Sequence, residues 1–160
     1  MAAVEVLLVQ PGASLGTFGS LVIAVTDGPS ALEASSVRVA VDTVARLRRT
    51  SHAQRLIYVY VVGERSGLPS DETRAITAEL AGLVDAVVGV HEGQGFRASV
   101  VRGIVVGISM LSRSRMRPEV VSTVAEAAAK LAERHPDLGS ESAVRAAIEQ
   151  VRGAVGPDPG

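Results

Sequence analysis

The 160-residue chain contains no cysteine and very few aromatic residues: two tyrosines, two phenylalanines and no tryptophan. The absence of cysteine excludes disulfides, thiolate metal sites and cysteine nucleophiles, and it fits a reducing compartment. The scarcity of aromatic rings removes the platforms on which single-stranded nucleic acids stack, and a net charge of −1 gives no long-range attraction for a polyanion. We therefore expect a cytoplasmic protein that does not bind nucleic acid.

The chain also lacks the apolar segments that direct a protein to a membrane. Residues 1–9 do not combine a basic start, a long apolar run and a small-residue cleavage site, so no secretory signal is predicted. The most apolar stretch, Ala98–Leu111, is shorter than the roughly 20 residues of a spanning helix, and Arg102 interrupts it. We expect a buried helix there and no membrane span.

Motifs for metal binding and catalysis are missing as well. The three histidines, His52, His91 and His135, do not show the spacing that would bring two of them together on one helix face around zinc. The nucleophile-elbow pattern Gly-x-Ser-x-Gly is absent. The sequence predicts no metal, no cofactor and no catalytic residue, which favours a non-enzymatic protein and leaves enzymatic activity open.

Short β-forming runs alternate with helical segments along most of the chain. The β-forming runs are Val4–Val9, Ser20–Thr26, Leu56–Val62, Ala86–Val90 and Glu119–Ser122. The helical segments cover 30–50, a helix capped by Ser70, 96–111, 123–134 and 140–155. Because parallel strands need crossover connections, this alternation predicts an α/β domain with a mostly parallel central sheet of about four to five strands and helices on its faces.

The end of the chain forms a further helix, for which docking on this domain and extension toward a partner are both open. Pro136 and Gly139 close the helix that begins at Thr123. We predict an α/β domain over 1–139 and a C-terminal helix with a tail over 140–160.

This order of elements resembles the STAS-like domains related to the sporulation anti-anti-sigma factor SpoIIAA. The resemblance covers about Val4 to Arg134, and its local support is the run from Glu119 to Leu131, which looks like the final strand and the last helix of that family. It implies a regulatory domain that binds a protein partner. This is our leading hypothesis.

The resemblance also points to the loop after the strand 56–62. Signalling members carry an Asp-Ser-Ser-Gly-Leu-like loop before a helix, and the residues in the similar position here are Glu64, Arg65, Ser66, Gly67 and Leu68. Arg65 then falls where the family's phosphorylated serine would be, so the resemblance does not imply phosphorylation at that position. We predict that these five residues bind the partner and that Ser66 is a turn serine.

Arg102 is a further candidate for partner recognition. A charged side chain on an apolar helix is costly to bury alone, so it should reach the surface or meet an anionic group.

A second hypothesis is a small-ligand or nucleotide-binding protein with a site at residues 91–97. Gly93, Gly95 and Arg97 lie in a run that matches the alanine-ending dinucleotide fingerprint, between a predicted strand and a predicted helix. His91 and Glu92 precede this run and could supply an acid and a base.

A third hypothesis is a structural homo-oligomer, with a homodimer as its simplest form. Gly103 and Gly107 lie one turn apart on the predicted apolar helix and would allow another backbone to approach closely. The C-terminal helix is the alternative contact surface.

Overall fold

The structure is a computed structural model. It describes residues 2–28, 34–50, 55–64, 66, 70–92 and 118–157. The predicted helix over 96–111 lies outside these residues. All structural statements below concern the described part of the chain.

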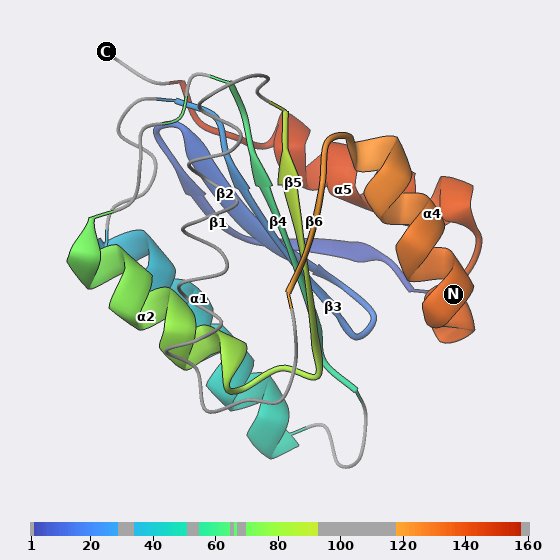
Figure 1. The fold of residues 1–160 in the computed structure, drawn as a ribbon, viewed down its shortest axis with the longest axis horizontal. Coiled ribbons are helices and arrows are strands. Elements are labelled where there is room, and N and C mark those ends of the chain that lie inside the picture. The colour runs from blue at the N-terminus through green and yellow to red at the C-terminus, as the bar shows by residue number, and fades with distance from the viewer. Residues whose placement is uncertain are drawn as a thin grey trace.

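Six strands form one mixed sheet in the order in which they occur along the chain (Figure 1). The strands are β1 (Val4–Gln10), β2 (Ala13–Phe18), β3 (Leu21–Thr26), β4 (Ile57–Val62), β5 (Ala86–His91) and β6 (Glu119–Val121). Strand β2 is antiparallel to both of its neighbours, β1 and β3, whereas β3, β4, β5 and β6 run parallel to one another. The predicted α/β class with a mostly parallel sheet is therefore confirmed.

The sheet has one more strand than the upper end of the predicted range, because Ala13–Phe18 is β2 and not part of a loop. Glycines in the turns on both sides of it, Gly12 and Gly19, have positive φ values of 71° and 58° and permit two tight reversals. Gly16 lies inside this strand, and the position excludes a larger residue because a Cβ there would come within 2.7 Å of Val151 Cγ2. A glycine that reads locally as a turn residue is thus required by a helix more than a hundred residues away.

Two layers of helices enclose the sheet. Helices α1 (Ala34–Thr50) and α2 (Asp71–Ala81) cover one face, and α4 (Val124–Arg134) and α5 (Glu141–Gly153) cover the other (Figure 1). A short 3₁₀ turn over Pro136–Leu138 joins α4 to α5. The C-terminal helix packs on the sheet, with Val144, Ala147, Ile148 and Val151 buried against it.

The predicted helix starts are confirmed by their capping hydrogen bonds. Ser70 Oγ accepts from Thr73 N at 3.1 Å and begins α2. Thr123 Oγ1 accepts from Glu126 N at 3.1 Å and begins α4. Each cap satisfies one of the backbone donors that a helix start leaves without an intrahelical partner.

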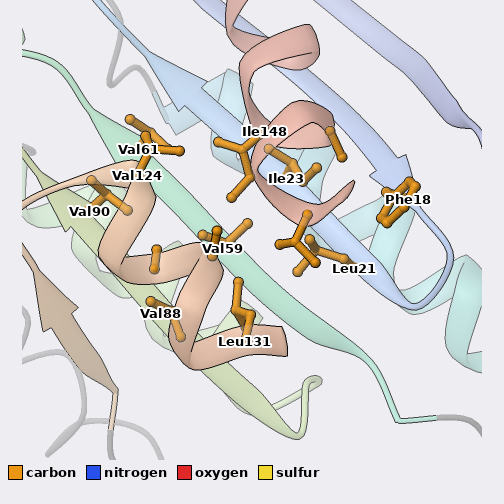
Figure 2. Close-up of a cluster of buried hydrophobic side chains, with 14 of the residues drawn as sticks. Phe18, Leu21, Ile23, Val59, Val61, Val88, Val90, Val124, Leu131 and Ile148 are labelled. Atoms are coloured by element: carbon orange, nitrogen blue, oxygen red, sulfur yellow. The ribbon is translucent and has the colours of Figure 1, made fainter. Parts of the chain in front are cut away.

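Alternate residues of the central strands enter two separate cores. Val59 and Val61 of β4 contact the α4 and α5 side (Figure 2), whereas Tyr58 and Tyr60 contact the α1 and α2 side. This two-sided burial explains why the sequence of β4 is an unbroken apolar run, Ile-Tyr-Val-Tyr-Val-Val.

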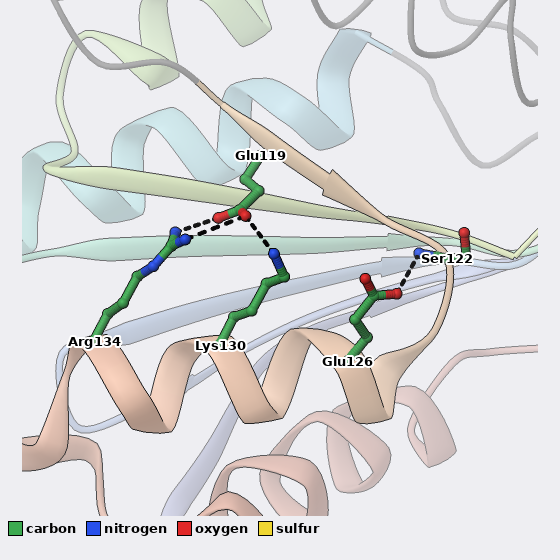
Figure 3. Close-up of polar contacts among 5 residues, drawn as sticks. All are labelled: Glu119, Ser122, Glu126, Lys130 and Arg134. Atoms are coloured by element: carbon green, nitrogen blue, oxygen red, sulfur yellow. Dashed lines mark hydrogen bonds and ion pairs between the residues drawn. The ribbon is translucent and has the colours of Figure 1, made fainter.

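An ion-pair cluster fixes α4 to the last strand. Glu119 of β6 accepts from Lys130 Nζ at 2.6 Å and is also paired with Arg134 (Figure 3). The hydrogen bonds from Lys130 and then from Arg134 lower the pKa of the Glu119 carboxyl. The capping residue Glu126 accepts from Ser122 N at 3.3 Å at the opposite end of this helix.

No helix in the described part of the chain is both long enough and apolar enough to cross a membrane.

Candidate functional site

The two predicted sites, in the segments after β4 and β5, begin side by side. Strand β4 ends at Val62 and β5 ends at His91, and these two residues are partners in the parallel ladder. We call the residues that end β3, β4 and β5 and those directly after them the carboxyl edge: Thr26–Asp27, Val62–Glu64 with Ser66, and His91–Glu92. The carboxyl ends of parallel strands are where α/β proteins usually place their binding residues.

Ser66 holds the loop after β4 onto the neighbouring strand. Its side chain is fully buried, and its Oγ donates to Thr26 O at 3.0 Å. Its backbone N donates to Gly63 O at 3.1 Å, and Gly63 N donates to Thr26 O at 2.8 Å. The serine is therefore a structural part of the turn, and its hydroxyl would have to leave these contacts before it could accept a phosphate.

His91 is buried at the end of β5 on the face covered by α1 and α2. Its ring meets that of Tyr60 edge to face, with the centroids 6.0 Å apart and an interplanar angle of 74°. Burial raises the pKa of the Tyr60 hydroxyl far above its usual range, so this hydroxyl stays protonated. The packing fixes the imidazole against an aromatic partner.

Glu92 connects the start of the loop after β5 to the C-terminal helix. Its backbone N donates to Val62 O at 3.3 Å, and its carboxylate pairs with the guanidinium of Arg152 on α5. Arg152 also lies 3.8 Å from Glu149 of the same helix. Arg152 is not predictable as a site residue from the sequence, because no local pattern relates it to a glutamate sixty positions earlier.

Three exposed acidic side chains lie at or next to the carboxyl edge among the described residues. Glu64 is exposed in the loop after β4, and Asp71 and Glu72 are exposed in the first turn of α2. Asp71 is 3.1 Å from Arg74. Carboxylates at this end of a helix are stabilised by its dipole, and together with Glu64 they are the exposed acidic groups of the described residues here.

The remaining predicted site residues, Arg65, Gly67, Leu68, Gly93, Gly95, Arg97 and Arg102, lie outside the described residues. Within the described ranges, no group of three or more His, Asp or Glu residues is placed to hold a metal ion.

No family model matches this chain, and no curated protein or solved structure matches it either. The STAS-like resemblance accordingly stays a prediction from the sequence.

Proposed function

We propose that the chain is a cytoplasmic, STAS-like regulatory domain without enzymatic activity, which binds a protein partner at the carboxyl edge. The partner contacts would come from Glu64 to Leu68 and from the start of α2, with Arg102 as a further contact.

The observation that carries this proposal is that two polar side chains at this edge are bound to other groups of the same chain. The Ser66 hydroxyl donates to Thr26 O, and the Glu92 carboxylate is paired with Arg152. A nucleophile or general base needs an accessible lone pair within reach of its substrate. Groups that are engaged in this way instead fix the backbone of the loops, and a fixed surface binds a partner with less loss of conformational entropy.

The exposed carboxylates of this surface favour a partner that places basic groups opposite them. Glu64 and Glu72 are both exposed, and complementary charge mainly accelerates encounter and excludes wrong partners. Association should therefore weaken as the salt concentration rises.

The test is quantitative capture from the native lysate with tagged wild-type chain and a Glu64→Lys, Glu72→Lys variant. The matched control is Glu133→Lys with Glu141→Lys, which makes the same charge change on α4 and α5. Both pairs consist of exposed residues, and Glu72 and Glu141 each lie in the first turn of a helix.

We expect wild type and control to retain a stoichiometric protein partner, and the edge variant to retain at least about tenfold less, a loss of about 1.4 kcal/mol. Equal retention by all three chains would contradict the proposed surface. Mass spectrometry of released small molecules would contradict the protein-partner function if it found a bound metabolite and no partner.

The alternative function is the binding of a small ligand or nucleotide at residues 91–97. It is favoured by one observation: His91 ends a parallel strand at the carboxyl edge and Glu92 follows it directly, at the place where ligands of such sheets bind. Calorimetric titration of the purified chain with ATP or NAD tests it. Saturable binding that is lost in Gly95→Asp, with an unchanged circular dichroism spectrum, would establish this function in place of the first.

A further inference from the structure

Strand β1 forms one edge of the sheet, and in the described part of the chain β2 is its only neighbouring strand. Its sequence is Val-Glu-Val-Leu-Leu-Val-Gln, with a single charge and no proline. Edge strands present backbone donors and acceptors to any strand that approaches, and soluble proteins usually protect them with lysine, proline or a covering segment.

The exposed large apolar side chains of the described residues are both on this strand. Val6 is 39% exposed and Val9 is 53% exposed. Their ladder partners on β2 are Gly16 and Ser14, which are the two positions that contact Val151 of α5. Paired residues of a ladder share a face, so Val6 and Val9 form an apolar strip beside α5.

A β-bulge between Val6 and Leu8 is what places these two valines on the same face. Leu7 is the extra residue, because Val6 pairs with Gly16 and Leu8 pairs with Leu15. Without the bulge, residues three apart on a strand would point to opposite faces.

We propose that β1 is the interface of a homodimer, in which two copies pair antiparallel across a two-fold axis with Val6 of each opposite Val9 of the other. The same register sets Leu7 opposite Leu8. It also brings the side chain of Glu5 toward that of Gln10, whose backbone O already accepts from Gly156 N of its own chain. The two-fold axis passes between Leu7 and Leu8 and joins the two sheets into one. It places both valine strips and both α5 helices on the same face of the joined sheet.

In this register β1 is complementary to itself, so a second copy of the chain is the partner that we expect to bind it. Each exposed valine covers an exposed valine, and the one charge of the strand meets an amide and not its own like charge. Among the described C-terminal residues, Gly156 contacts the end of the strand: Gly156 N donates to Gln10 O at 3.0 Å, and Gly12 N donates to Gly156 O at 3.0 Å. The backbone pairing of two copies is therefore centred on the strand before Gln10.

The expected dimer is weak. A strand of this length spans about 24 Å, and its edge buries considerably less than the roughly 800 Å² per partner of a standard interface. We therefore expect a dissociation constant in the micromolar range or weaker. Self-association of this kind does not depend on the proposed partner binding, because β1 and the carboxyl edge share no residue.

Sedimentation equilibrium of the full chain over a concentration series tests the interface. Wild type should approach twice the monomer mass at high concentration, and Val9→Lys should weaken dimerisation at least about tenfold because lysine on an edge strand opposes pairing. The control is Ala75→Lys at an exposed position of α2 on the opposite face. A wild type that stays monomeric at millimolar concentration, or a dimer that Val9→Lys leaves intact at unchanged melting temperature, overturns the proposal.

The absence of natural cysteines allows the register to be tested directly. Under mild oxidation, a mixture of Val6→Cys and Val9→Cys chains should form intermolecular disulfides faster than either variant alone, since only the mixture brings two thiols into a cross-strand pair. Faster linkage within either single variant overturns the stated register.

Discussion

At the scale of single residues, Glu119 is held in its charged form by two cations of α4. Its pKa is lowered chiefly by the hydrogen bonds from Lys130 and Arg134. A depressed folded-state pKa contributes stability above the unfolded value, about 4.3, and this contribution is lost as the pH falls through the folded value. We expect Glu119→Gln to lower the free energy of unfolding at pH 7 by no more than about 1 kcal/mol, since the cluster is partly exposed and screened by solvent.

Urea unfolding at several pH values between 7 and 3 measures this effect. The difference between wild type and Glu119→Gln should shrink below about pH 4.5. The control is Glu133→Gln, a change at an exposed position of α4. A difference that stays constant down to pH 3 would show that the carboxylate charge is not responsible.

Gly89 and Tyr60 form a second residue-scale pair, on adjacent strands. A Cβ at position 89 would lie 2.3 Å from Tyr60 Oη and 2.4 Å from Cζ, so Gly89→Ala forces the ring from its place and should cost about 1–3 kcal/mol. In a double-mutant cycle with Tyr60→Ala, most of that cost should disappear because the clash is gone. Additive effects of the two changes on the urea midpoint would refute this explanation of the glycine.

At the scale of elements, α5 matters because it covers the half of the sheet that β1, β2 and β3 form. Ile148 is fully buried in this contact, and Ser14 Oγ donates to Val151 O at 2.6 Å. Ile148→Ala should destabilise the protein by about 2–5 kcal/mol through lost burial and a cavity. Arg145→Ala, an exposed change on the same helix, should stay within about 0.5 kcal/mol, and urea denaturation of both variants compares them.

At the scale of the whole molecule, the last helix and the sheet bury one continuous apolar cluster that includes Phe18, Leu21 and Ile23. A chain that ends at Gly139 would expose this surface. We expect it to bind a hydrophobic dye, to aggregate and to lose its cooperative thermal transition. A soluble monomer with the melting temperature of the full chain would instead establish residues 1–139 as an independent domain.

Local sequence patterns determined much of this protein. Features that depend on neighbouring residues could be predicted from the sequence. They are the β-branched runs of β4 and β5, the caps at Ser70 and Thr123, and the alternation of strands and helices. They were sufficient for the α/β class and for placing Ser66 and Glu92 after strands, whereas the strand predicted to end at Val90 continues through His91. They could not show that the ends of β4 and β5 are neighbours in the sheet, because that depends on strand order.

The tertiary structure alone decided the features that join distant parts of the chain. Position 16 of β2 requires glycine because Val151 packs against it, and Glu92 is neutralised by Arg152. The valines at positions 6 and 9 share a face only because a bulge shifts the ladder with β2. Each of these depends on a contact between residues far apart in sequence, so its physical cause lies in packing and not in local propensity.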